Sequence, residues 1–231
     1  MTTASAAKEG GRERNLERGQ VVVEALALLE EVGVGGLTLR KLADRLHVKA
    51  AALYWHFENK QDLIDAMAAS IILGAFERST PPSENWRDLL AWIARTNHQA
   101  LLSRRDGVQI LAHANMSQTG MMDGLEALMR TLTQQGFSSD LAMSSFFAII
   151  RYTIGCVFEE QADPRHNSVG RNVERVHRLQ RNPERYPYMN KIITPIIKKQ
   201  RDNPQFLFEQ GLDIILDGVG KRFASEKPLA G

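Results

Sequence analysis

The stretch "TLRKLADRLHVKAAALYWHFENK", residues 38–60, decides the fold of this chain. Its apolar residues recur at helical spacing, which predicts two short helices: "LRKLADRL", for which Thr38 is a suitable N-cap, and a second from Ala50 to about Phe57. Residues 47–49 predict a tight turn between them. The same spacing upstream predicts a supporting helix that stops at the glycines of "GVGG". A supporting helix and two further helices joined by a short turn describe a helix-turn-helix.

The charge of this stretch differs from that of the whole chain. Between Thr38 and Lys60, five Lys or Arg residues stand against Asp44 and Glu58, a local charge of +3, whereas the formal net charge of all 231 residues is +2. A basic surface of this kind suits phosphate contacts, which supply much of the affinity for nucleic acid. Helix-turn-helix shapes also occur by chance in helical proteins that do not bind DNA. Spacing and charge alone therefore leave both alternatives open.

The rest of the chain also shows helical periodicity, and no segment predicts a strand, so an all-α fold is expected. Asn59, followed by Asp62, is a weaker form of the capping box and opens a long helix that Pro81 and Pro82 end. Further helices are expected over residues 86–107, a short segment through Leu111, 121–136, 138–160, 192–199 and 204–223. Between them lies a polar stretch, 162–187, in which a short helix near 173–178 is considered.

Composition excludes several classes of protein. The single cysteine, Cys156, rules out a disulfide within the chain, and its surroundings, "TIGCVF", predict a small buried core residue rather than a nucleophile. No stretch approaches the ~18 uninterrupted apolar residues of a membrane helix, and the N-terminus lacks the apolar core of a signal peptide. A soluble, cytoplasmic protein without a membrane partner is expected. The sequence has no Gly-rich phosphate loop, no Ser/His/Asp set in a context that suits a catalytic triad, and no paired carboxylates on one helix face. It therefore does not predict an enzyme.

Residues 37–67, "LTLRKLADRLHVKAAALYWHFENKQDLIDAM", strongly resemble the DNA-binding segment of the TetR family of repressors. The likeness rests on Thr38 before the second helix, the Leu42-Ala43 pair, the Leu-Tyr-Trp-His run at 53–56 and the Asn59-Lys60 pair. It continues further along the chain, because "LLSRRDG", "TQQGFS" and "TIGCVFEEQ" resemble the tetracycline-repressor branch. The resemblance covers most of the chain and is looser in the central region.

The resemblance implies a transcriptional repressor with three parts: a mobile N-terminal arm at 1–15, a helix-turn-helix DNA-binding domain at 16–62, and an effector-binding and dimerisation domain at 63–231. It implies a homodimer held by a four-helix bundle of residues 138–160 and 204–223 from each subunit, although a merely central helix fits these segments equally well. A dimer places two recognition helices about one DNA turn apart, ~34–36 Å, on a palindromic double-stranded operator. Binding of a small-molecule effector then releases the DNA.

The residues expected to contact DNA are Thr38, Arg40, Lys49, Ala50, Ala51, Ala52, Tyr54, Trp55, His56 and Lys60. Arg40 is the best candidate for a guanine contact, because a guanidinium bridges O6 and N7. The three alanines occupy the family's base-facing positions, where they touch thymine methyls. Lys49 is expected to reach a base or a phosphate.

The other members of this set are expected to hold the DNA backbone. Thr38 and Lys60 stand at helix starts, where hydroxyl, ammonium and backbone N–H groups bind phosphates. Tyr54 and His56 are expected to do the same from the recognition helix. For Trp55, contact with DNA and packing in the core are both open.

The central region departs from the tetracycline repressor at the positions that bind its ligand. In the register set by "RRDG", the histidine that holds the metal of a magnesium–drug chelate falls at Leu111, a second drug-contacting histidine at Phe76, and a polar Thr-Arg-Pro turn at residues 114–116. Leucine and phenylalanine cannot ligate a metal, so no metal or other cofactor is expected.

The residues expected to contact a ligand are apolar, with a few polar groups to orient it: Phe76, Leu111, Met116, Met143, Phe146, Phe147 and Ile150, together with Asn97, His113, Asn115 and Arg151. This mixture suits a flat, largely hydrophobic antibiotic or polyketide-like compound with a few oxygens. Ordinary core packing explains part of the set equally well. An efflux or resistance gene is the expected target. A response to magnesium–tetracycline and a DNA binder without an effector are the alternatives.

Overall fold

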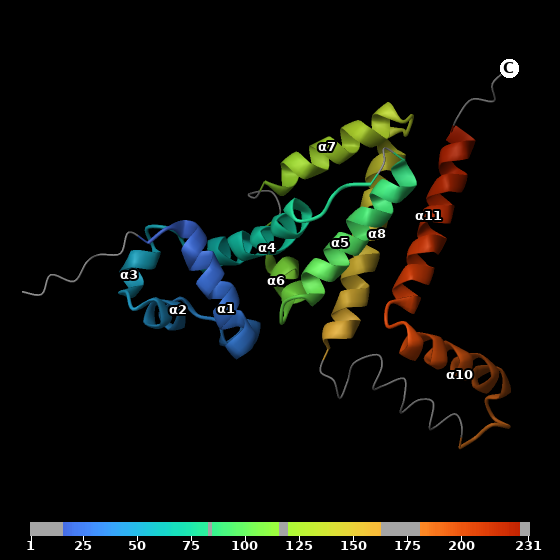
Figure 1. The fold of residues 1–231 in the computed structure, drawn as a ribbon, viewed down its shortest axis with the longest axis horizontal. Coiled ribbons are helices and arrows are strands. Elements are labelled where there is room, and N and C mark those ends of the chain that lie inside the picture. The colour runs from blue at the N-terminus through green and yellow to red at the C-terminus, as the bar shows by residue number, and fades with distance from the viewer. Residues whose placement is uncertain (1–15, 83–84, 116–119, 163–180, 227–231) are drawn as a thin grey trace, which may run out of the picture.

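The computed structural model describes residues 16–82, 85–115, 120–162 and 181–226, and every regular element in these ranges is an α-helix (Figure 1). The N-terminal helices are α1 (Arg18–Gly36), α2 (Leu39–Leu46), α3 (Ala50–Leu53) and α4 (Lys60–Glu77). The later helices are α5 (Trp86–Leu102), α6 (Gly107–His113), α7 (Met121–Gln134), α8 (Ser139–Gln161), α10 (Pro187–Asp202) and α11 (Phe206–Glu226). The expected all-α fold is confirmed.

The helices form a small N-terminal unit, α1 to α3, and a larger helical body, and α4 runs from one to the other (Figure 1). Within the body α5, α8 and α11 pack against one another. A first group of buried apolar residues, which includes Leu29, Leu53 and Leu63, continues into the body at Leu101 and Val157. The N-terminal unit is therefore packed directly on the body, and the predicted division at residues 62 and 63 stays a prediction.

The local signals that opened α2 and α4 act as the sequence predicts. Thr38 Oγ1 accepts a hydrogen bond from the N–H of Lys41 at 3.2 Å, and Asn59 Oδ1 accepts one from the N–H of Asp62 at 3.0 Å. His47, with φ of 56°, ends α2 in the left-handed conformation and makes the tight turn. The angle between α2 and α3 thus follows from residues that are adjacent in sequence.

α1 ends within "GVGG", as expected: its regular part is interrupted at Gly33, whose φ is 67°, and its last residue is Gly36. Two other helix ends in the N-terminal half differ from the prediction. α3 ends at Leu53, and a turn rather than a helix carries the chain toward Phe57. α4 ends at Glu77, before the prolines that were expected to end it.

Gly107 begins α6 instead of ending the helix that starts at Trp86. α5 ends at Leu102, and the Gly107 N–H donates to the carbonyl of Arg104 at 3.1 Å. An ideal Cβ on Gly107 would lie 2.3 Å from the carbonyl oxygen of Leu101. Only glycine permits this close approach between the end of α5 and the start of α6. Further on, α10 is longer than the expected segment 192–199, and the helix considered at 173–178 lies outside the described residues.

Among the described residues, α8 is the one helix that is long and apolar enough to cross a membrane, with a mean hydropathy of 1.6. It packs between α5, α7 and α11, with Leu141, Ile149 and Val157 buried, as a core helix of the body does. Cys156 on this helix is half-buried rather than buried. Burial raises the pKa of its thiol, which disfavours the reactive thiolate.

Candidate nucleic-acid interface and effector region

Most residues of the expected DNA-contacting set are exposed around α2 and α3, and only Ala52 and His56 are half-buried. Trp55 is 89% exposed, so its side chain lies on the surface and not in the core. Leu53 and Phe57 hold this segment, since their side chains are at most 1% exposed. The segment therefore presents small and aromatic side chains outward on a fixed apolar anchor.

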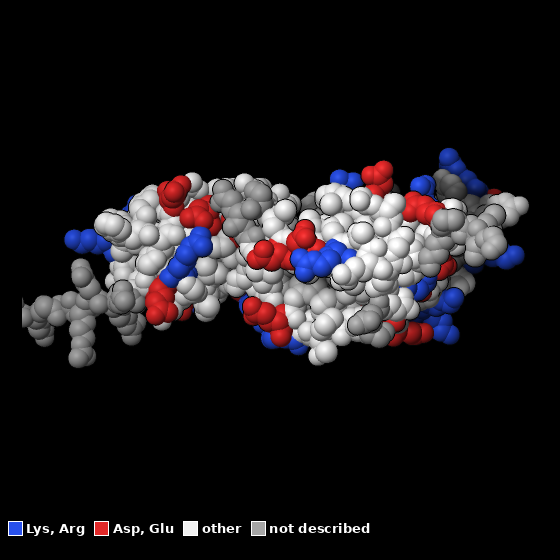
Figure 2. All heavy atoms as spheres, turned by 90° about the horizontal axis from the view of Figure 1, so that it is seen from above, with Lys and Arg blue, Asp and Glu red and all other residues white. Residues whose placement is uncertain are grey.

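The basic residues of this surface are not all available for phosphates. Arg45 pairs with Glu24 at 2.8 Å and with Glu31 at 2.6 Å, which holds α2 on α1. Arg40, Lys49 and Lys60 are exposed. On the face shown in Figure 2, basic and acidic side chains lie beside one another over most of the molecule, as the small net charge implies. A local surface must therefore provide the contacts with phosphates.

Arg18, in the first turn of α1, holds the end of the recognition segment. Its Nη2 donates to Asp62 Oδ1 at 2.6 Å, its Nε donates to the carbonyl of His56 at 3.3 Å, and its Cζ lies 4.8 Å from the centroid of the Phe57 ring. Asp62 Oδ2 also accepts from the N–H of Glu58 at 3.3 Å. Sequence reasoning missed Arg18, because its partners lie far along the chain.

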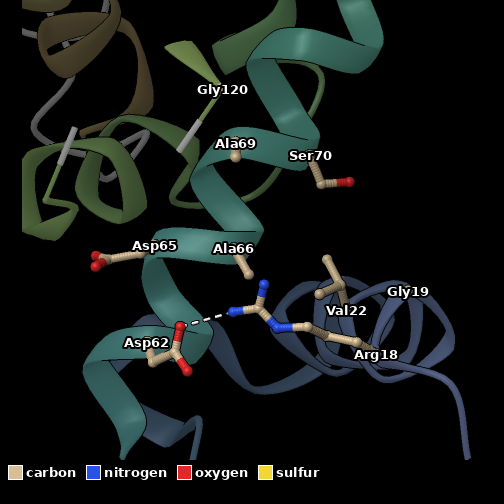
Figure 3. A pocket seen from close by; sticks show the side chains of 9 residues that line it. All are labelled: Arg18, Gly19, Val22, Asp62, Asp65, Ala66, Ala69, Ser70 and Gly120. Carbon is tan, nitrogen blue, oxygen red and sulfur yellow. Dashed lines mark hydrogen bonds and ion pairs between the residues drawn. The ribbon is translucent and has the colours of Figure 1, made fainter. Parts of the chain in front are cut away.

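A cavity of about 410 Å³ lies between α1 and α4, and Arg18 reaches across it to Asp62 (Figure 3). Its wall includes Val22 from α1 and the small side chains of Ala66 and Ala69 from α4. None of the residues expected to contact the ligand lines this cavity. It is thus a separate feature from the expected effector region.

The apolar residues of the expected effector region are divided between two core groups. Leu111 belongs to the first group, and Phe146 and Ile150 pack against a second one, which includes Leu90, Leu132 and Phe208. Phe76 packs against both. Leu111 on α6 is buried, and Phe76, Met143, Phe146 and Ile150 are half-buried. Phe76 meets the ring of Trp92 edge-on, with the centroids 4.9 Å apart. These side chains from α4, α6 and α8 form the innermost part of the set, and Met116 lies outside the described residues.

The structure does not bring the remaining members of the set to the same place. Phe147 and Arg151 are on the exposed side of α8, where the Arg151 guanidinium lies 4.9 Å from the centroid of the Phe147 ring. Asn97 is buried and donates to the carbonyl of Ile93 at 2.8 Å. His113 is exposed, with Nδ1 2.6 Å from the carbonyl oxygen of Gln109. Helical spacing alone does not separate the inner side of α8 from its outer side.

The end of α6 is joined to α4 through a buried carboxylate. Asp65 is 3% exposed, and its Oδ1 accepts from the amide of Gln61 at 2.7 Å and from the backbone N–H of Asn115 at 2.8 Å. The Gln61 amide also donates to the carbonyl of His113. The contact of Asn115 with Asp65 is thus made by its backbone N–H. A shift of residues 113–115 must act directly on the first turns of α4.

The start of α6 is joined to α1 by the loop that precedes it. Asp106 Oδ2 accepts from the N–H of Val34 at 2.8 Å, just beyond the kink of α1. Arg105 Nη1 donates to the carbonyls of Glu30 and Glu31, each at 3.0 Å. Both ends of the short α6 are therefore attached to the N-terminal unit or to the helix that leads out of it.

A helix-turn-helix unit with an exposed second helix, attached at several points to a helical body, defines a DNA-binding regulator. The family described as "Bacterial regulatory proteins, tetR family" matches residues 21–67, and "Tetracyclin repressor-like, C-terminal domain" matches residues 79–223. The chain belongs to the TetR family and is a helix-turn-helix transcriptional repressor.

Similar proteins cover nearly the whole chain. Tetracycline repressor protein class A from transposon 1721 of Escherichia coli is 38% identical over 214 residues, which are 90% of this chain and 92% of that protein. A variant of TetR from Acinetobacter baumannii AYE, solved in complex with minocycline, is 34% identical with a TM-score of 0.66 and covers 89% of this chain and 97% of that one. A possible TetR family regulator from Streptomyces coelicolor A3(2) is 29% identical with a TM-score of 0.73, covering 89% and 99%.

Replacing Arg18 with alanine is expected to weaken DNA binding about 3- to 30-fold on every sequence, because two hydrogen bonds that position the recognition segment are lost. The Arg18–Asp62 pair is half-exposed, so only a small part of this effect is expected in thermal stability. Titration of labelled DNA by fluorescence anisotropy measures the change. The matched control is Arg87→Ala, which breaks an arginine pair with Asp217 on α11. Equal effects of the two substitutions would contradict the assignment.

Proposed function

We propose that this repressor is a homodimer that binds a palindromic operator with α2 and α3 and leaves it when a flat, largely hydrophobic molecule binds between α4, α5, α6 and α8. The observation that carries the proposal is the attachment of α6 at both ends, through Asp106 to α1 and through Asp65 to α4. A ligand in contact with α6 therefore acts on the N-terminal unit through hydrogen bonds that already exist. An efflux or resistance gene is the proposed target.

The mechanism rests on linkage between the two binding sites. The effector lowers operator affinity only if it binds the DNA-incompetent arrangement better than the competent one. We propose that a ligand beside Leu111 displaces the end of α6, that Asp65 passes the shift to α4, and that the distance between the two recognition helices changes. Equal separations of these helices in DNA-bound and effector-bound dimers would contradict this mechanism.

A magnesium chelate does not fit the residues of this region. The position of the metal-binding histidine is occupied by Leu111, whose side chain is buried among apolar residues of the first core group. Within the described ranges no group of three or more His, Cys, Asp or Glu side chains is placed to hold a metal ion. The relatives named for tetracycline and the minocycline complex support a polycyclic ligand, and Leu111 favours recognition without a metal.

The proposed dimer is supported by apolar side chains that one subunit leaves in water. On α11, Leu207 is 41% and Ile214 72% exposed, and Gly218 is exposed with no atom within 4 Å of the place where a side chain would begin. On α8, Phe158 is 61% exposed. Leu207, Ile214 and Gly218 follow the spacing of one helix side, and Gly218 allows a second helix to approach closely. Such a surface suits a bundle of α8 and α11 from two subunits.

For DNA recognition we propose that Arg40 reads a base and that Lys60 holds a phosphate, while the alanines at 50–52 make apolar contacts. Replacing Arg40 with alanine is then expected to cost about 1–3 kcal/mol of binding free energy on the operator and little on other sequences.

Replacing Lys60 with alanine is expected to weaken binding equally on all sequences and to reduce the salt dependence of binding. Anisotropy titrations with operator and scrambled DNA separate the two. A uniform loss for Arg40→Ala would make Arg40 a phosphate contact.

The direct test of the proposed function is a gel shift on the DNA upstream of the gene. The protein is expected to retard this DNA, and a flat polycyclic compound is expected to release it without magnesium. Minocycline with and without Mg²⁺ separates the metal-dependent alternative, which predicts release only with the metal. Retardation that no such compound relieves would favour a DNA binder without an effector.

A further inference from the structure

Two buried polar atoms among the described residues have no hydrogen-bond partner: Trp92 Nε1 on α5 and Thr153 Oγ1 on α8. Other buried polar side chains of these two helices are paired. Asn97 donates to the carbonyl of Ile93 at 2.8 Å, and Ser145 donates to the carbonyl of Leu141 at 2.7 Å. Most buried polar groups in folded proteins have a partner, because leaving one unpaired costs its full desolvation. The two exceptions therefore indicate a partner that binds from outside the chain.

Trp92 lies within the region proposed for the effector. Its ring packs edge-on against Phe76 and, like Phe146 and Ile150, packs against the second core group. Thr153 is one helical turn beyond Ile150, is 1% exposed and lies on the buried side of α8. α5 and α8 pack along each other in the body (Figure 1). The unpaired atoms were found independently of the ligand-contacting set, and they lie on two packed helices, one of which carries Phe146 and Ile150.

We infer that Trp92 and Thr153 supply the hydrogen bonds that orient the effector, and that the effector is a neutral, flat polycyclic ketone or quinone. The inference rests on the proposed function and specifies the ligand of that site. An indole N–H donates only, so the ligand must present an acceptor oxygen to Trp92, whereas the Thr153 hydroxyl both donates and accepts. The buried His98 has its Nε2 3.2 Å from Glu160 Oε1, so this nitrogen already has a partner within the chain.

These two groups also explain how the site rejects a hydrocarbon of the same shape. An apolar pocket alone discriminates poorly between similar flat molecules, whereas a site with buried hydrogen-bonding groups rejects an analogue that cannot pair with them. Anthraquinone and anthracene have the same ring system and differ in two carbonyl oxygens. The parent protein is therefore expected to bind anthraquinone at least about tenfold more tightly than anthracene.

The experiment uses the full chain and three variants. Trp92→Phe keeps an aromatic ring against Phe76, Thr153→Val keeps the shape of the side chain, and Ser145→Ala removes a paired hydroxyl on the same helix as the matched control. Trp92→Phe and Thr153→Val are each expected to bind anthraquinone about tenfold more weakly, with anthracene binding unchanged. Ser145→Ala is expected to bind both as the parent does. Quenching of tryptophan fluorescence measures these affinities.

Thermal unfolding without ligand gives a readout that is independent of the probe. Thr153→Val is expected to unfold at the same or a higher temperature than the parent, because an unpaired buried hydroxyl is removed, whereas Ser145→Ala is expected to unfold at a lower one. A marked drop for Thr153→Val would show a structural partner and overturn its assignment. Anthraquinone that binds no better than anthracene, or equally to the parent and both variants, would overturn the inference as a whole. Retardation of upstream DNA by the parent and both variants separates this failure from failure of the proposed function.

Discussion

Replacing Ile214 with aspartate is expected to convert the dimer into monomers and to lower operator affinity by about 10²–10⁴-fold. Ile214 is 72% exposed in one subunit, on the side of α11 that Leu207 and Gly218 share. In a two-fold symmetric interface each substitution occurs twice, so two carboxylates would be buried without partners. Each half of a palindromic operator is then bound by a separate monomer, and the gain from linking two binding units is lost.

Sedimentation velocity on the variant measures the change in assembly, and anisotropy titration measures operator binding. The matched control is Met122→Asp, which places the same charge at an apolar side chain that is 52% exposed on α7, outside the proposed bundle. The control is expected to remain dimeric and to bind the operator normally. An Ile214→Asp protein that stays dimeric would mean that α11 is not in the interface.

The parts of the fold that the sequence predicted depend on residues close together in the chain. The caps of α2 and α4 use Thr38 and Asn59 with partners three residues away, so a short motif contains all the information they need. The role of Gly107 is different, because it is set by the carbonyl of Leu101 at the end of another helix. A glycine in sequence marks a place where the chain can turn, but the neighbouring helix decides whether one helix ends or another begins there.

In the candidate site, too, the features that the sequence predicted depend on residues close together in the chain, and the others depend on packing. The exposed recognition segment was predictable, since the residues that form it are consecutive and match a known motif. The contacts that fix this segment on α1 and those that join α4 to α6 were not predictable. Arg18 and His56, or Asp65 and Asn115, are brought together only by packing. Trp55 was open between core and surface for the same reason. Leu53 and Phe57 are buried on either side of it, but helical spacing could not assign the residue between them.

Replacing Asp65 with alanine is expected to leave operator binding intact and to abolish most of the response to the effector. The substitution removes the acceptor for the N–H of Asn115 and also the acceptor that holds the Gln61 amide, whose second hydrogen bond goes to the carbonyl of His113. It therefore breaks one connection between the end of α6 and α4 and releases the side chain that makes the other. Coupling between two sites in such proteins is typically worth about 1–3 kcal/mol, or roughly 5–150-fold in affinity. Without this connection the effector still binds beside α6, and its effect on operator affinity is expected to fall close to one-fold.

The same substitution is expected to lower thermal stability, which separates loss of coupling from an assignment error. Removing the buried Asp65 carboxylate and its two hydrogen bonds costs about 1–3 kcal/mol, which corresponds to a fall of roughly 2–12 °C in the unfolding midpoint. Asp65→Asn is the matched control, because its amide oxygen can still accept both hydrogen bonds without the charge, and it is expected to retain most of the response. Asp106→Ala breaks the connection at the other end of α6. If the two connections transmit the signal in series, the Asp65→Ala, Asp106→Ala double variant should lose no more of the effector response than Asp65→Ala alone. A full effector response in a folded Asp65→Ala protein would show that the signal reaches α4 by another path.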